Sequence, residues 1–230
     1  MKIANIILLC ELFFSMPLTV YLTGEYYYLA GALIIAQLMI PFLLSFKGAR
    51  PTSGEVVALL VMCALAVIGR VAIPIPNFKA TYGIIMLSGI AMGSPFGFMV
   101  GAVTALVSNF FYGQGAYMPW QMMGYGSAGM LAGFVFSRHR VRPKAIYLAL
   151  FGFASVVVWV GPVLDVAHLF VMMPDTTLRS AFLSFLSGLP VNISQGCATV
   201  LVMLLLGRPI LEKLHRVRTR YSDTEDIYGL

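Results

Sequence analysis

The feature that most limits how this chain can fold is an unbroken stretch of 58 residues, positions 80–137, that contains no Asp, Glu, Lys or Arg. The whole chain of 230 residues is 60% hydrophobic and only 10% charged, whereas an average soluble domain is about 25% charged. So few charged side chains cannot keep the surface of a soluble protein of this length hydrated. The composition therefore excludes a water-soluble globular fold and predicts an integral membrane protein.

The number of membrane crossings follows from the length of the apolar runs, because a helix needs about 20 apolar residues to cross the hydrocarbon core. Pro95, flanked by Gly93 and Gly97, predicts a break in the fourth run, which is too long for one crossing. The sequence therefore predicts eight transmembrane helices and an all-α polytopic fold. The seven runs are residues 3–22, 26–46, 54–75, 81–111, 118–136, 145–170 and 180–206.

The basic residues orient these helices, because Lys and Arg accumulate in short cytoplasmic loops. With eight crossings and both termini in the cytoplasm, 12 of the 15 basic residues fall on the cytoplasmic side. Only Arg70, Lys79 and Arg179 lie on or near the outside. The net charge of +6 is thus explained by topology, and it does not indicate nucleic-acid binding, because the aromatic residues lie in apolar runs.

An outward-facing loop at residues 109–121 combines amide side chains, aromatic rings and two glycines. Glycine lets the backbone approach a ligand, amides both donate and accept hydrogen bonds, and rings provide flat apolar walls. This composition favours a pocket for an uncharged, partly apolar solute over a simple interfacial aromatic belt. The candidate binding residues in the loop are Asn109, Tyr112, Gln114, Tyr117, Trp120 and Gln121.

Two further loops, at residues 70–79 and 165–179, reach the same side in this topology. Their candidate binding residues are Arg70, Asn77, Lys79, Asp165 and His168. Two alternatives stay open here. Arg70 and Asp165 could neutralise each other instead of contacting a ligand, and Asn192 in the last run could form an interhelical hydrogen bond or contact a substrate.

Motifs for catalysis and for metal binding are missing from the sequence. There is no phosphate-binding loop of the Walker type and no H-E-x-x-H zinc motif. The three cysteines are far apart and show no C-x-x-C spacing. We therefore expect no catalytic residue, no metal site and no ATPase activity in this chain, and an intramembrane enzyme is the weakest of the functional alternatives.

Four segments carry a resemblance to a known family: LAVIGR at 65–70, IPNFK at 75–79, VSNFFYGQG at 107–115 and PWQM at 119–122. Over residues 54–207 the chain resembles the substrate-specific (S) component of energy-coupling factor (ECF) transporters, especially the cobalamin-type subgroup. The resemblance implies a six-helix core at residues 53–207, preceded by a two-helix extension at 1–52 and followed by a cytoplasmic tail at 208–230.

The resemblance also implies a function in vitamin uptake across a bacterial plasma membrane. Such a subunit of an ABC transporter captures its vitamin outside the cell and then joins a transmembrane coupling protein and two ATPase subunits. A cobalamin-like corrinoid is expected as transported ligand rather than as cofactor. Gly54 and Ala58 stand at the spacing of the Ala-x-x-x-Ala pattern with which S components dock onto the coupling protein. The alternatives are another vitamin or precursor, or an accessory membrane protein.

Overall fold

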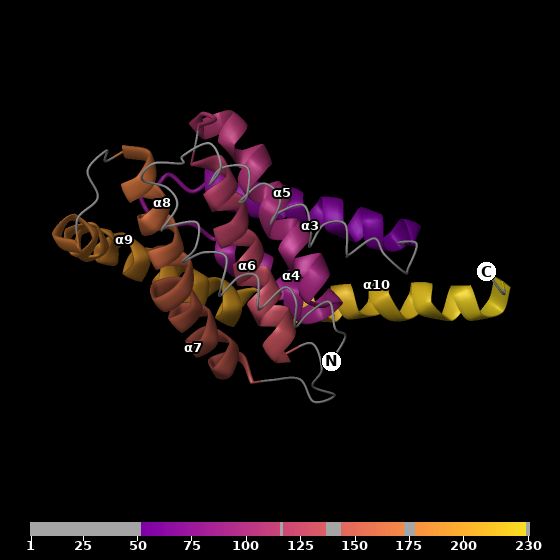
Figure 1. Cartoon of the computed structure of the whole chain (residues 1–230). Coiled ribbons are helices and arrows are strands. Elements are labelled where there is room, and N and C mark those ends of the chain that lie inside the picture. Colours follow the sequence, from indigo (N-terminus) through magenta and orange to yellow (C-terminus); the bar gives the residue numbers. More distant parts are fainter. Residues whose placement is uncertain (1–51, 116, 137–143, 173–177, 229–230) are drawn as a thin grey trace.

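The computed structural model describes residues 52–115, 117–136, 144–172 and 178–228, and within these ranges every regular element is a helix (Figure 1). The expected two-helix extension at residues 1–52 lies outside the described residues except for Thr52. The helices are α3 (Ser53–Val71), α4 (Thr81–Met92), α5 (Ser94–Tyr112), α6 (Met118–Phe136), α7 (Ala145–Ser155), the π-helical turn η1 (Val156–Val160), α8 (Gly161–Met172), α9 (Leu178–Leu205) and α10 (Gly207–Tyr228).

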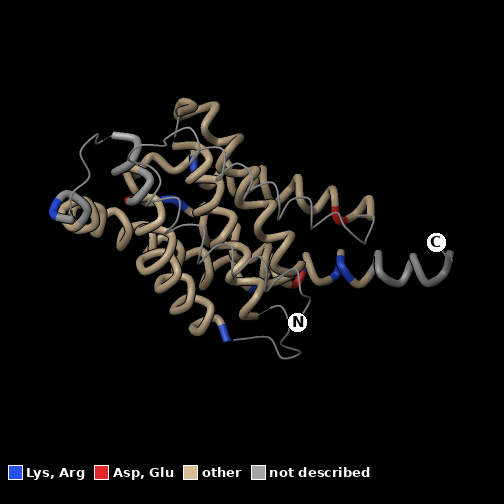
Figure 2. Tube along the Cα trace, in the orientation of Figure 1, with Lys and Arg blue, Asp and Glu red and all other residues tan. Residues whose placement is uncertain are grey.

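Four helical segments in the described part of the chain are long and apolar enough to cross a membrane. They are Ser53–Val71, Ser94–Tyr112, Ala145–Asp165 and Phe182–Leu205. Charged residues are rare in the helices between α3 and α10, where the described part of the tube in Figure 2 is mostly tan. The all-α, multi-pass membrane character expected from the sequence is confirmed, whereas the number of crossings and the location of the termini stay predictions.

The expected break near Pro95 is present. Helix α4 ends at Met92, Gly93 adopts the positive φ of 107° that glycine tolerates, and α5 begins with Pro95 in its first turn. At about 1.5 Å per residue, the 12 residues of α4 span only about 18 Å. Ten of those residues are buried, because α4 packs among α3, α5, α6, α9 and α10. A helix too short to cross a bilayer is thus enclosed by longer ones.

Glycine residues bring the backbones of α5 and α6 into direct contact. A Cβ atom added at Gly101 would lie 2.2 Å from the carbonyl oxygen of Tyr125, and one added at Gly97 would lie 2.5 Å from that of Gly129. The small residues of α6 permit such close packing. This contact holds the two helices in one fixed register, which places the end of α5 beside the start of α6.

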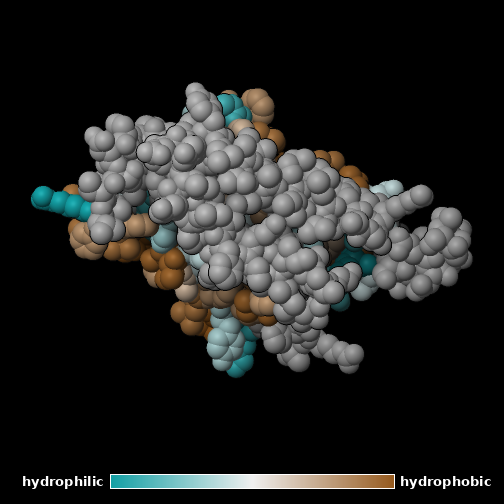
Figure 3. Space-filling view, in the orientation of Figure 1, coloured by the Kyte–Doolittle hydropathy of each residue, from teal (hydrophilic) through white to brown (hydrophobic). Residues whose placement is uncertain are grey.

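The C-terminal half of the chain covers the other side of this pair. Helices α7 and α8 are joined through η1, and α9 packs along them. The exposed part of α7 is hydrophobic, as expected of a surface that faces lipid (Figure 3). The tail after residue 207 forms α10, which the sequence analysis did not assign to a helix. In Figure 1, α10 continues beyond the end of α9 and runs beside the first half of α3, with which it is in contact.

Candidate functional site

Four polar residues from three helices form one hydrogen-bonded group, here called the Arg70 network. Arg70 in the last turn of α3 donates from Nη1 to the hydroxyl of Ser108 and, at 2.9 Å, to Oδ1 of Asn109 on α5. Asn109 is completely buried, and its Nδ2 donates to Oε1 of Gln121 on α6 at 2.8 Å. The Arg70 network therefore joins α3, α5 and α6 at one end of the bundle.

Two tyrosine rings flank the guanidinium of Arg70. Its Cζ lies 5.0 Å from the ring centre of Tyr112 and 5.2 Å from that of Tyr125, both within cation–π distance. Tyr125 is buried and packs edge-to-face against Tyr82 of α4 at 4.8 Å. Tyr112 is half exposed and its hydroxyl donates to the carbonyl oxygen of Arg70 at 2.8 Å. The guanidinium thus contacts the buried ring of Tyr125 on the side of the core and the half-exposed ring of Tyr112 on the accessible side.

Arg70 retains hydrogen-bonding capacity that the described part of the chain does not use. A guanidinium has five N–H donors, and both of the hydrogen bonds described above come from Nη1. Nε and Nη2 make no hydrogen bond with any residue that the structure describes. The Arg70–Asp165 ion pair, which the sequence left open, is likewise absent from the described residues. The half-buried guanidinium can therefore still donate to the acceptor atoms of a ligand.

Asp165 pairs instead with an amide across the α8–α9 interface. Asn192 donates from Nδ2 to Oδ2 of Asp165 at 2.9 Å, which confirms the interhelical hydrogen bond that was one of its two predicted roles. Two glycines make room for the pair. A Cβ atom at Gly188 would lie 2.4 Å from Oδ1 of Asp165, and one at Gly161 would lie 2.3 Å from Cγ of Asn192.

The loop expected at residues 109–121 is shorter than the sequence suggested. Asn109 and Tyr112 belong to α5 and Gln121 belongs to α6, so that only residues 113–117 connect the two helices. The error arises because amides and aromatic rings also occur at buried helix ends, where composition alone does not separate a helix from a loop. Helix ends position these side chains more rigidly than a loop would.

Several predicted binding residues lie outside the Arg70 network. Gln114 donates to the carbonyl of Leu106 at 3.3 Å, and Tyr117 donates to that of Gly113 at 2.7 Å. Both hydrogen bonds therefore stay within α5 and the short α5–α6 connection. Trp120 is buried in α6 with only 4% of its surface exposed. Exposed His168 lies one turn after Asp165 on α8.

The connection between α3 and α4 is held by its own contacts. Asn77 is exposed and has a φ of 57°, a left-handed conformation in which Asn is common. Lys79 donates from Nζ to the carbonyl of Ile73 at 2.5 Å, and the Ala80 amide donates to the carbonyl of Gly69 at 3.1 Å. The structure therefore does not bring Asn77 and Lys79 into the Arg70 network.

Sequence reasoning missed Ser108 and Tyr125, both of which contact Arg70. A usable signal existed for Tyr125, because it follows Gln121 by four residues and two residues at this spacing share one face of a helix. Ser108 directly precedes Asn109, and its hydroxyl also donates to the carbonyl of Ala105 at 3.2 Å. A serine with such a local bond gives no sequence signal of a second partner.

Two other predictions, the docking residues and the absence of a metal site, do not involve the Arg70 network. Gly54 and Ala58 line an apolar groove between α3 and α10, and nothing in the structure tests their role toward a coupling protein. Within the described ranges, no three His, Cys, Asp or Glu side chains are placed to hold a metal ion together.

Comparison with known proteins places these observations in a family context. A family model described as "ECF-type riboflavin transporter, S component" matches residues 52–213, well over half of the chain. Comparisons with curated proteins and with solved structures found no match. The match agrees with the resemblance to S components, but its description names riboflavin, so the cobalamin-type subgroup expected from the sequence is not supported.

Proposed function

The chain belongs to the family of ECF-type riboflavin transporter S components, and from this membership we propose that it captures riboflavin or a closely related flavin for uptake. S components are the substrate-binding membrane subunits of ECF transporters and are not themselves enzymes. The partners that we propose for this chain are the transmembrane coupling protein and the two ATPase subunits of an ECF module. The proposed location is the bacterial plasma membrane.

The observation that supports a flavin is the composition and geometry of the Arg70 network. The ring system of riboflavin is planar, aromatic and uncharged, and one edge carries carbonyl oxygens and nitrogen acceptors on either side of an N–H group. Free donors on Arg70 and the amide of Gln121 complement such an edge. The half-exposed ring of Tyr112 offers a flat surface for stacking.

The charge balance of this region also suits a neutral ligand. Helices α4, α5 and α6 contain no charged residue, and Arg70 is the charged member of the Arg70 network. An uncharged aromatic solute loses little hydration on entering such a site, whereas an unpaired charge would lose much. A neutral flavin therefore fits the region better than a multiply charged solute does.

The experiment that tests this function identifies the bound molecule. The full chain, purified in mild detergent from cells supplied with both riboflavin and cobalamin, is denatured and the released ligand is recorded by visible absorbance. We expect the spectrum of a flavin, and a saturable quenching of riboflavin fluorescence when riboflavin is added to ligand-free protein. A corrinoid spectrum, or the absence of any quenching, would refute the flavin assignment.

A control separates the substrate from the transporter class. Co-purification with a coupling protein and ATPase subunits tests membership in a working ECF complex independently of the ligand. If the complex assembles but no flavin binds, only the substrate is wrong. If flavin binds but no ATPase subunit assembles with the chain, the substrate stands and the proposed partners are wrong.

A further inference from the structure

An apolar groove of about 280 Å³ runs between α3 and α10, at the opposite end of α3 from Arg70. The wall on the α3 side includes Gly54, Ala58 and Val61, whose small side chains leave the groove open. Leu214 and Val217 contribute to the wall on the α10 side. An apolar cavity of about 150 Å³ can hold a benzene molecule, so this groove has room for a longer piece of hydrocarbon.

One charged residue stands at the groove. Lys213 of α10 lines it, is exposed, and forms no ion pair with any residue in the described part of the chain. Arg216 follows three residues later, is also exposed, and has no ion-pair partner among the described residues. Residues three apart are neighbours on a helix surface. Two cations without a carboxylate partner therefore lie close together at the edge of an apolar groove.

The other charged groups near this place are already occupied. Glu55 in the first turn of α3 accepts a hydrogen bond from the amide of Thr52 at 3.1 Å and completes a capping box there. Glu212 pairs with Arg208 at 3.1 Å. The carboxylates nearest in sequence to the two cations are thus engaged elsewhere, which leaves both cations available to an anionic group from outside the described part of the chain.

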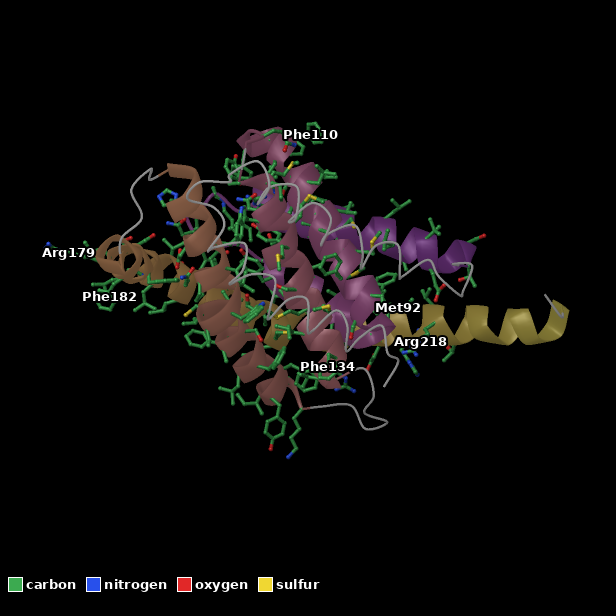
Figure 4. All side chains as sticks on the ribbon, viewed as in Figure 1. Met92, Phe110, Phe134, Arg179, Phe182 and Arg218 are labelled. Atoms are coloured by element: carbon green, nitrogen blue, oxygen red, sulfur yellow. The ribbon has the colours of Figure 1, made fainter. Side chains whose placement is uncertain are left out.

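Helix α10 is held against the bundle, so the groove is a fixed feature rather than a gap beside a loose tail. Arg218 donates from Nη1 to the carbonyl of Ala91 in the last turn of α4 at 3.2 Å. A cation at this position also interacts favourably with the helix dipole of α4. Figure 4 shows Arg218 and Met92, the last residue of α4, beside each other where the two helices meet.

We propose that the groove between α3 and α10 binds one anionic phospholipid, with an acyl chain along the apolar walls and the phosphate headgroup on Lys213 and Arg216. The charge pattern supports a lipid, because basic residues that directly follow a membrane-spanning helix attract anionic headgroups. The apolar lining supports an acyl chain. The site is separate from the Arg70 network and does not rest on the proposed substrate.

The test measures lipid binding to the full chain, purified in detergent without any coupling protein, by native mass spectrometry. Phosphatidylglycerol is compared with phosphatidylcholine carrying the same acyl chains. We expect one phosphatidylglycerol to be retained in preference to phosphatidylcholine. A single Lys contributes about 1 kcal/mol to the binding of anionic lipid, so Lys213→Gln should raise the Kd for phosphatidylglycerol about fivefold.

Two matched pairs of variants make the result specific. Lys144→Gln removes an exposed lysine that does not line the groove and should leave the Kd unchanged. Val61→Trp fills the groove and should abolish retention of the lipid, whereas Val56→Trp changes an exposed valine of the same helix outside the groove and should not. Circular dichroism and gel filtration verify that each variant is folded.

Several results of these measurements would contradict the proposed lipid site. Equal retention of the two lipids, or equal effects of Lys213→Gln and Lys144→Gln, would overturn the proposal. Retention of phosphatidylglycerol by folded Val61→Trp would overturn it as well. If Val61→Trp instead leaves lipid binding intact and prevents assembly with the coupling protein, the groove is a protein interface and not a lipid site.

Discussion

Replacing Asn109 by alanine tests whether the Arg70 network positions the guanidinium for a ligand. The substitution removes two partly buried hydrogen bonds, one from Arg70 at 2.9 Å and one to Gln121 at 2.8 Å. A bond to a charged group contributes about 1.5–3 kcal/mol and a neutral one about 1 kcal/mol. We therefore expect the free energy of unfolding to fall by roughly 2–4 kcal/mol.

The effect on ligand affinity follows from the freedom that Arg70 regains. In Asn109→Ala only Ser108 still accepts a hydrogen bond from the guanidinium. A ligand would then have to immobilise the side chain again, at a cost of about 0.5–1.5 kcal/mol. This corresponds to a Kd for riboflavin that is roughly two- to twelvefold higher. Fluorescence titration measures the Kd, and thermal unfolding in detergent measures the stability.

The neighbouring residue provides the control for this prediction. Phe110 is 74% exposed on the same turn of α5, and Phe110→Ala should change neither the stability nor the Kd appreciably. If Asn109→Ala is less stable yet binds riboflavin with the affinity of the unmodified protein, Asn109 has a purely structural role. If neither quantity changes, the Arg70 network does not exist in solution as described.

Three further substitutions test contacts between the helices. Gly101→Ala places a Cβ atom 2.2 Å from the backbone oxygen of Tyr125 and should destabilise the protein by about 1–3 kcal/mol or prevent folding. In Gly124→Ala the new atom meets side-chain atoms of Leu164 at 3.2 Å and Val163 at 3.4 Å and no backbone, so thermal unfolding should show a much smaller loss, and equal losses would contradict the glycine contact. Asn192→Ala leaves the carboxylate of Asp165 without its amide donor and should lower the unfolding free energy by about 1–3 kcal/mol. An unchanged melting temperature would show that this pair contributes nothing.

The membrane fold can be predicted well from the sequence, because the hydropathy of a run and the effect of a proline on the backbone depend on residues that are neighbours in the chain. The break at Pro95 could be located from the sequence, because proline favours the first turn of a helix and the glycine before it tolerates the positive φ at which α4 ends. Close packing of α6 against some neighbour could also be predicted, because residues such as Gly129 have no side chain to separate two helices, but its partner α5 could not. The amphipathic α10 is hard to predict because the many charged residues of the tail mask the helical spacing of Leu214 and Val217.

The candidate site could be predicted only in part, because hydrogen-bond partners depend on tertiary packing. Arg70, Asn109 and Gln121 could each be singled out as polar residues near the ends of apolar runs. Their mutual bonds could not, since nothing in the sequence fixes how the end of α5 faces the start of α6. The partner of Asp165 illustrates the same limit, because charge complementarity made Arg70 one candidate partner whereas the structure pairs Asp165 with a neutral amide.

The most direct test of the central claim is an experimental structure of the full chain with riboflavin bound. We predict that one edge of the flavin ring lies within hydrogen-bonding distance of the Arg70 guanidinium, with the ring beside Tyr112. A flavin bound without contact to Arg70 would contradict the claim. So would a protein that crystallises with a corrinoid and excludes riboflavin.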